Sequence, residues 1–467
     1  MHTQFSQLKR TALIWQDYAG LVYLTTPVIL FFLLYTVPIL GIAISASIIY
    51  ILSRIKIEKN ETKPDNKLLV VNAIVAVIIV FLSGICGPLY NNTDWLKHFA
   101  IYNELVNSAS LASNGSTLRY YLGMYITPAL IEKILGTHEE GLFLSLWIAL
   151  GLFIFFNQLS SVATTKTLQY LAPIVFMAFS GADIIGYFFT GFQRGQIHHF
   201  EWWAGWGQYS SAITSIFWSP QSTLPAWIII AYLFRRPKIE NALYVAPIFL
   251  FACLLWSPFI AFGISPLLGA YFFRKETLKA KINPTYLLIL AVILSLLTIY
   301  ITTDSSEIPK NFPWNNKCLK SLPGEPCFSF YGYLSFITLE ALGPILLVLL
   351  FRETRNQLTI ASTFVLLLIP LIQLGLYNEI VMYGSRPAMS AIVIAMIISI
   401  EKASLLRKVL IISILAAGFA TPASEIFRSL TMNTTFNKTQ SLVEFIQNKP
   451  QYEKQYLTQD NIWFIRR

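Results

Sequence analysis

Long apolar runs recur along the whole chain, and they constrain its fold more than any other feature. Of the 467 residues, 55% are hydrophobic and only 12% are charged, whereas a soluble chain carries about 25% charged residues. Runs of about twenty apolar residues are long enough to cross the hydrocarbon core of a bilayer as helices. The sequence therefore predicts an all-α polytopic membrane protein, with about 11–13 transmembrane helices and shorter helices in its extracytoplasmic loops.

Lysine and arginine cluster in short loops at 54–67, 235–238 and 274–281. Such loops are typically cytoplasmic, so the net charge of +10 reflects orientation rather than nucleic-acid binding. We therefore expect a multi-pass protein of the cytoplasmic (inner) membrane, in contact with membrane lipid. Four longer loops would lie on the extracytoplasmic side: 89–121, 190–222, 303–330 and 377–388.

The apolar runs extend over residues 1–422, which we expect to form one transmembrane domain, and a polar tail follows at 423–467, on the extracytoplasmic side. The run at 11–52 is too long for one comfortable span, so it predicts one long tilted helix or two short ones. Residues 168–189 predict a single span. The run at 122–135 is short, which suits a re-entrant or surface helix better than a span.

A short polar segment at 91–99 combines an acid, a base, an imidazole and an indole. Lys97 and His98 follow Asp94 by three and four residues, which places all three on one face of a helix that begins at Asp94. An acid at a water-lined membrane surface can act as a general base or hold a metal, and a lysine beside it can neutralise a phosphate. The alternative is an N-cap acid followed by two interfacial polar residues.

Arg119 and Tyr120 end the loop in which Asp94 lies. The pair is typical of an aromatic-belt anchor with a snorkelling arginine. The alternative hypothesis, which we weigh equally, is a clamp for the phosphate of a lipid.

The segment after residue 197 is rich in tryptophan and also contains His198, His199, Glu201 and Trp202. An amphipathic helix at the membrane interface explains the tryptophans, but it does not explain two histidines and a glutamate. Indoles stack on sugar rings, and Glu and His can bind hydroxyls, so the functional hypothesis is recognition of carbohydrate or lipid.

Asp183 lies within an apolar run, near the expected depth of Asp94. An ionisable group in a span is a site candidate by default, and the alternative is a buried Asp bonded to Ser180 or to a neighbouring span. Arg386 lies in the fourth outer loop, where it and Glu379 could simply pair with each other.

Cys318 and Cys327 share one outer loop, where an oxidising compartment permits the disulfide that we expect. There is no Gly-rich phosphate loop and no Walker or Rossmann motif, which argues against a cytoplasmic nucleotide as substrate. The carboxylate ladders of a di-metal site are also missing from the sequence. We therefore expect no cofactor, and a divalent metal is not favoured.

In this layout the chain resembles the C superfamily of integral-membrane glycosyltransferases, which take sugars from polyprenyl-phosphate donors. The resemblance lies in the many spans, the acid Asp94 in an early outer loop, the surface helices expected at 95–110 and 122–135, and the basic-aromatic patches at that face. Two segments, Arg119-Tyr-Tyr-Leu-Gly-Met-Tyr and Glu201-Trp-Trp with Trp218-Ser-Pro-Gln, are similar to uncharacterised bacterial membrane proteins of this type. The chain differs in having at least two apolar runs before its acid, and in having a single acid rather than a metal-binding pair.

The resemblance implies that Asp94 removes a proton from the acceptor hydroxyl, and that attack from the opposite face inverts the anomeric carbon of a hexosyl or pentosyl group. It implies a glycan or lipid-linked acceptor, as in the biosynthesis of cell-envelope polysaccharide. The residues expected to bind the donor phosphate are Lys97, His98, Arg119 and Tyr120. Those expected to bind sugar or acceptor are His198, His199, Glu201, Trp202, Asp183 and Arg386.

Two other functions compete with this one. A secondary transporter, or a flippase of lipid-linked oligosaccharides, would use Asp17, Asp183 and Glu340 as charged groups near the bilayer midplane. A polymerase or ligase of surface polysaccharide would differ only in its donor and acceptor. The sequence favours an enzyme, because its charge is concentrated at one membrane surface.

Overall fold

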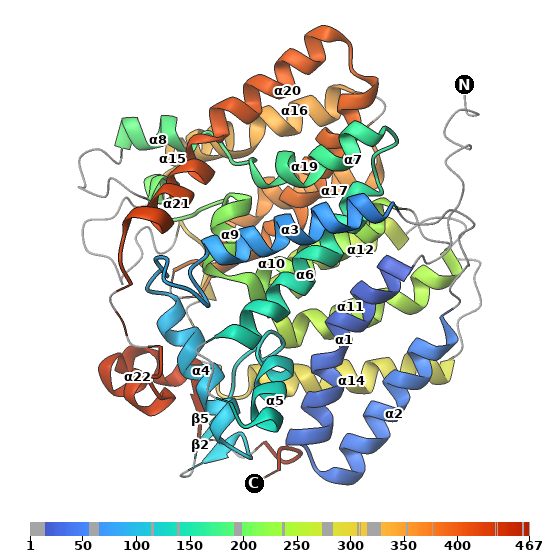
Figure 1. The fold of residues 1–467 in the computed structure, drawn as a ribbon, viewed down its shortest axis with the longest axis vertical. Coiled ribbons are helices and arrows are strands. Elements are labelled where there is room, and N and C mark those ends of the chain that lie inside the picture. The colour runs from blue at the N-terminus through green and yellow to red at the C-terminus, as the bar shows by residue number, and fades with distance from the viewer. Residues whose placement is uncertain are drawn as a thin grey trace.

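The computed structural model describes most of the chain, and its helices lie side by side in one bundle (Figure 1). Within the described residues the protein is an all-α polytopic membrane protein with very little sheet, so the predicted fold class is confirmed. The described residues are 15–55, 65–113, 116–137, 141–190, 199–235, 239–272, 284–305, 308, 310–314, 328–351, 354–375, 377–434, 436, 438–459 and 462–466.

Six helical segments in this part of the chain are long and apolar enough to cross a membrane: α1 (Trp15–Tyr35), α6 (Leu142–Ser160), α14 (Pro284–Thr302), α15 to α16 (Phe330–Leu350), α18 to α19 (Glu379–Lys402) and α20 to α21 (Leu405–Thr431). Shorter apolar helices accompany them: α2 (Pro38–Arg54), α3 (Asn66–Leu82), α11 (Ile239–Trp256), α12 (Pro258–Phe272) and α17 (Gln357–Leu368). The remaining helices that position the site are α4 (Trp95–Asn107), α5 (Ile126–Leu135), α7 (Lys166–Met177), α8 (Asp183–Thr190), α9 (Ala212–Trp218), α10 (Pro220–Phe234), α22 (Leu442–Asn448) and α23 (Glu453–Tyr456).

The long apolar run at 11–52 forms two helices, which was one of the two predicted alternatives. The interruption falls at Thr36 and Val37, and Pro38 begins α2, where its missing N–H would have had no helical partner. The Val37 N–H instead donates to the carbonyl of Phe464, 2.9 Å away in the C-terminal tail. The tail thus satisfies a backbone group that the break exposes.

The prediction of a single span at 168–189 is wrong, because α7 ends at Met177 and α8 begins at Asp183. The N–H of Ala182 donates to the carbonyl of Leu339, 2.9 Å away on another helix. That helix is also irregular, since a π-turn at Thr338–Leu342 separates α15 (Phe330–Ile337) from α16 (Gly343–Leu350). Two interrupted helices therefore meet at this point.

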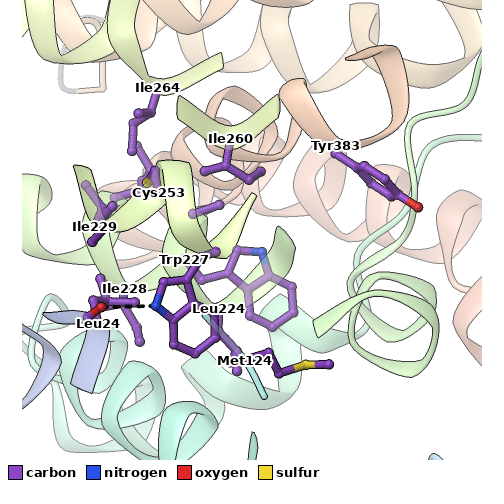
Figure 2. Close-up of a cluster of buried hydrophobic side chains, with 14 of the residues drawn as sticks. Leu24, Met124, Leu224, Trp227, Ile228, Ile229, Cys253, Ile260, Ile264 and Tyr383 are labelled. Carbon is purple, nitrogen blue, oxygen red and sulfur yellow. Dashed lines mark hydrogen bonds between the residues drawn. The ribbon is translucent and has the colours of Figure 1, made fainter. Parts of the chain in front are cut away.

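The core is centred on α10, which is buried along nearly its whole length. Figure 2 shows Ile229 of α10 beside Cys253 of α11. The ring of Trp227 packs on another side of α10, against Phe155 of α6 and Phe176 of α7. A helix that is apolar all round is typical of the centre of a membrane bundle. Truncating such a residue, for example Trp227→Ala, removes about 3–5 kcal/mol of stability.

One rim of the bundle carries short helices. α4 and α22 lie toward the left of Figure 1, near the buried helix α9 and near α21, which ends the last long apolar segment. α5 has ten residues, or about 15 Å of helix, which is too short to cross a bilayer. It buries Ile126 and Ala129 and exposes Ile131 and Ile134, so it has the two-faced form expected of a surface helix.

The polar tail at 423–467 packs back onto the loop at 89–121. Strand β5 (Leu457–Thr458) pairs antiparallel with β2 (Ser116–Leu118), which also pairs with β1 (Ala112–Ser113). A second small pair is formed by β3 (Lys310–Asn311) and β4 (Gln373–Leu374). The tail therefore forms part of the same rim as α4.

Candidate functional site

Asp94 lies at the first turn of α4, at the rim of the bundle. Its side chain makes no capping hydrogen bond and instead pairs with Lys97, with 2.9 Å between Oδ2 and Nζ. The backbone around the pair is held by Asn92, whose Oδ1 accepts from the Asp94 N–H and whose Nδ2 donates to the carbonyl of Phe217. The Trp95 indole N–H donates to the same carbonyl, 2.7 Å away. α9 thus fixes the start of α4 in place.

Both members of the ion pair stay charged at neutral pH. Burial raises the pKa of the Asp94 carboxyl, but the Lys97 ammonium outweighs this effect and holds the pKa below its usual value. Burial lowers the pKa of Lys97, but Asp94 and neighbouring phenols raise it well above its usual value. The Asp94 side chain is 35% exposed and that of Lys97 is 18% exposed, so both remain accessible.

Several phenol and charged side chains interact electrostatically with this pair. These side chains come from the loop after Arg119, from α18 (Glu379–Gly384) and from the C-terminal tail. They are Tyr121, Glu379, Tyr383, Lys449, Tyr452 and Tyr456. We call these six residues, with Asp94 and Lys97, the rim cluster. Phenols donate hydrogen bonds and carboxylates accept them, so such a cluster can bind hydroxyl and phosphate oxygens.

His98 lies behind the pair, on the buried face of α4, with both ring nitrogens engaged. Nδ1 is 2.6 Å from the Tyr125 hydroxyl and Nε2 is 3.1 Å from the carbonyl of Trp218. Because a carbonyl only accepts, Nε2 carries the proton. Burial, helped by Lys97, lowers the pKa of His98 to about 3. A neutral imidazole of this kind positions α4 against α9 and offers no charge to a phosphate.

Arg119 and Tyr120 hold the tail against the rim. The Arg119 guanidinium is buried and donates to the carbonyls of Ile301, at 2.9 Å, and Lys454. Its backbone N–H donates to the carbonyl of Tyr456. Tyr120 stacks on Tyr121, with 3.8 Å between ring centroids. Arg119 is thus occupied by backbone, whereas Tyr120 stands next to the rim cluster.

Arg386 lies behind Tyr383 and is not paired with Glu379. Its guanidinium donates to the backbone and side chain of Ser219 and to Thr223, at 2.7–3.0 Å. It also lies over the ring of Tyr383, 4.7 Å from the centroid. Arg386 therefore orients a member of the rim cluster by a cation–π contact.

The tryptophan-rich segment forms a separate, more buried cluster. His199 stacks on Trp218, with 5.1 Å between ring centroids, and its Nδ1 lies 3.5 Å from Glu425. Trp202 is partly exposed on the short 3₁₀ helix η3 (Phe200–Ala204). The side chains of this segment are thus directed toward α9 and α21 as well as toward the surface.

Glu201 points into the protein. It accepts from the backbone N–H of Ser211, 2.7 Å away, and from Gln208. Burial raises the pKa of Glu201 to about 7, and the nearby Asp183 adds to the effect. Glu201 is therefore only partly ionised at neutral pH.

Asp183 and Glu340 meet in the interior, and neither is exposed. Asp183 accepts from Ser180, as the alternative interpretation of this residue predicted, and from Thr421. Glu340 accepts from the indole N–H of Trp203, and its carboxyl group is a neighbour of the Asp183 carboxyl group. We call Asp183 and Glu340 the carboxyl pair.

The structure thus distributes the predicted site residues over two regions. Asp94 and Lys97 belong to the rim cluster, with Tyr120, His98 and Arg386 next to it or behind it, whereas His199, Glu201, Trp202 and Asp183 lie in or beside the interior cluster. His198, Cys318 and Cys327 lie outside the described residues. Among the residues described, no three His, Cys, Asp or Glu side chains are placed to hold a metal.

The sequence analysis did not predict a role for most of the rim cluster. Glu379, Tyr383, Tyr452 and Tyr456 lie far along the chain from Asp94, so no spacing could connect them with it. The available signals were an acid in the fourth outer loop and tyrosines in an otherwise polar tail.

Comparison with known proteins assigns no family to the chain. No protein-family model matches it, and neither does any curated protein or solved structure. Its function is therefore argued from its own residues.

Proposed function

We propose that the protein is a membrane glycosyltransferase, which moves a sugar from a polyprenyl-phosphate donor to an extracytoplasmic glycan or lipid-linked acceptor. The observation that supports this most is the accessible, ionised Asp94 carboxylate beside Lys97, with several phenols nearby. A base that is charged at neutral pH can accept a proton without prior activation.

In the proposed reaction, the acceptor hydroxyl oxygen attacks the anomeric carbon as the bond from that carbon to the phosphate oxygen breaks. The hydroxyl proton passes to Asp94, and the bonding electrons leave with the lipid phosphate. Lys97 stabilises the developing negative charge, since an ammonium acts on a phosphate as a point charge. Tyr121, Tyr383 and Tyr456, which interact electrostatically with Lys97, would donate hydrogen bonds to sugar or phosphate oxygens.

The proposed active face is extracytoplasmic, in the inner membrane. The clustering of lysine and arginine in loops predicted to be cytoplasmic, at 54–67 and 274–281, supports this orientation. A polyprenyl-phosphate donor would reach the rim cluster from the adjacent leaflet, which suits a site built on short surface helices.

The test is sugar transfer by the full-length protein in lipid nanodiscs, with polyprenyl-phosphate-linked hexose or pentose as donor. We expect Asp94→Asn to lower kcat by about 10²–10⁴-fold, the usual contribution of a general base. Asp65→Asn is the matched control, because Asp65 also begins a helix but caps it directly. Unchanged transfer by the Asp94→Asn variant would remove the proposal.

One observation favours the second candidate, a transporter or flippase of a lipid-linked substrate. The carboxyl pair lies where two interrupted helices meet, and such breaks form substrate and ion sites in secondary transporters. Flipping of a labelled lipid-linked sugar in proteoliposomes separates the two functions. A transporter would lose flipping in Glu340→Gln and keep it in Asp94→Asn. A polymerase or ligase would behave as the glycosyltransferase does, with another donor and acceptor.

A further inference from the structure

Two interrupted helices create an unusual contact in the interior of the bundle. The chain between α7 and α8 passes so close to the π-turn that a Cβ on Gly181 would collide with Oε2 of Glu340 and lie 2.9 Å from its Cα. The Ala182 N–H donates to the carbonyl of Leu339 across the same contact. π-turns and broken membrane helices occur mainly where a site requires them.

The carboxyl pair lies at this contact, and one oxygen of each carboxyl group accepts hydrogen bonds from neighbouring side chains. Oδ2 of Asp183 accepts from Ser180, at 2.6 Å, and from Thr421, at 2.9 Å. Oε1 of Glu340 accepts from Trp203, at 2.5 Å. The remaining oxygens, Oδ1 of Asp183 and Oε2 of Glu340, are buried and meet no hydrogen-bond donor in the described chain. The two carboxyl groups are neighbours, so a proton held between them would supply the donor that both oxygens lack.

The charges around the pair are mostly negative. Glu201 interacts with both members of the pair, and Glu425 interacts with Glu201. The positively charged groups interact with Glu201 and Glu425 instead of with the carboxyl pair. His199 and Arg428 contact Glu425, and Arg386 interacts electrostatically with Glu201. No ion pair in the described residues joins a cation to Asp183 or Glu340.

Two neighbouring carboxyl groups, without a cation and away from water, cannot both be ionised. We infer that Asp183 and Glu340 form a proton-binding site, in which one proton shared between the two carboxyl groups joins α8 to the π-turn. When that proton leaves, two carboxylates face each other, and the contact between the interrupted helices separates. Glu201 and His199, whose side chain is 20% exposed, mark the route toward the surface.

This inference is independent of the proposed function, because the rim cluster contains none of these residues. A transferase could use the site to hold its fold, and a transporter could use it to couple movement to protons. The geometry identifies a proton as the ligand and Asp183 and Glu340 as the two groups that bind it.

The experiment is infrared spectroscopy of the full-length protein in nanodiscs at about pH 9, where Glu201 is ionised. We expect a carboxylic-acid C=O band that shifts in D₂O. The band should disappear in Glu340→Gln and in Asp183→Asn, because each amide supplies its own N–H to the remaining carboxylate. Glu201→Gln is the matched control and should keep the band.

A second measurement uses wild-type protein, so it does not require that the variants fold. Labelling wild-type protein with ¹³C at the side-chain carboxyl of glutamate or of aspartate should shift the band if either member of the pair carries the proton. Absence of the band from wild type, its persistence in both amide variants, or its insensitivity to both labels would overturn the inference. A thermal shift produced by Na⁺ but not by choline, in wild type without the band, would show a metal cation in place of the proton and would overturn it too.

Discussion

The rim cluster and the carboxyl pair both contain a carboxylate with one close partner, but the partners have opposite character. Asp94 lies 2.9 Å from an ammonium and is 35% exposed, whereas Asp183 lies beside a second carboxyl group and is not exposed. A carboxylate beside a cation keeps its charge, and a carboxyl pair in an apolar interior has to share a proton. An aspartate can thus act as a charged base in the rim cluster, whereas an aspartate of the carboxyl pair shares a bound proton.

The largest expected effect concerns the cation of the rim cluster. Lys97→Met leaves Asp94 without its counter-ion and removes the charge proposed to stabilise the departing phosphate. We expect kcat/KM for sugar transfer to fall by at least about 100-fold, or about 2.7 kcal/mol of transition-state stabilisation. Lys133→Met, at an exposed lysine of α5, is the control. Equal activity of Lys97→Met and Lys133→Met would show that the ion pair of Asp94 and Lys97 is structural and takes no part in the reaction.

A second effect concerns stability rather than rate: the interior residue Glu201 makes the free energy of unfolding depend on pH in a defined direction. Burial raises the pKa of Glu201 to about 7, from about 4.3 in an unfolded chain. The stabilising contribution of the protonated form is fully present below about pH 4 and is lost as the pH rises through about 7. Across this window we expect wild type to lose roughly 2–4 kcal/mol of unfolding free energy that Glu201→Gln retains.

Unfolding midpoints in denaturant, measured at several pH values, check this profile. Asp94 should behave in the opposite way, because its lowered pKa makes its contribution disappear as the pH falls below about 4. Its exposure limits that contribution to about 1 kcal/mol or less. Stability that rises for wild type between acidic and neutral pH would contradict the contrast between the two regions.

A smaller loss of stability is expected from overpacking the contact between the interrupted helices. Gly181→Ala places a methyl group against the backbone and carboxyl of Glu340, and overpacking of this kind costs about 1–3 kcal/mol. Gly87→Ala is the matched control, since the added Cβ would meet only ordinary contacts with Phe81. We expect Gly181→Ala to lower thermal stability and to weaken the carboxylic-acid band, and neither change is expected from Gly87→Ala.

The smallest effect tests whether the tail closes the rim cluster. The hydroxyls of Tyr377 and Tyr452 lie 2.9 Å apart, joining the start of α18 to the tail. Tyr452→Phe removes this hydrogen bond, which is worth about 0.5–1.5 kcal/mol. We expect KM for the acceptor to change several-fold while kcat stays close to wild type. A loss confined to kcat would instead place Tyr452 among the groups that act in the reaction.

Several features of the fold could be predicted because they depend on neighbours in the chain. The apolar runs predict membrane helices through length and composition alone. The ion pair of Asp94 and Lys97 follows from the helical repeat, which brings residues three apart onto one face. The break between α7 and α8 was not predicted, because the group that its backbone contacts at Gly181 is Glu340, which lies on a helix distant in the sequence.

The sequence by itself determined that this chain is a helical membrane protein, and it brought an acid and a base together at the start of one helix. Composition and helical periodicity are local, so they act before any distant contact forms. Only the tertiary structure decided which other groups join them. Glu379 and Tyr456 reach Asp94, and Glu340 reaches Asp183, because close packing of helices and tail places these side chains together. Whether a buried acid keeps its charge or shares a proton depends on that packing.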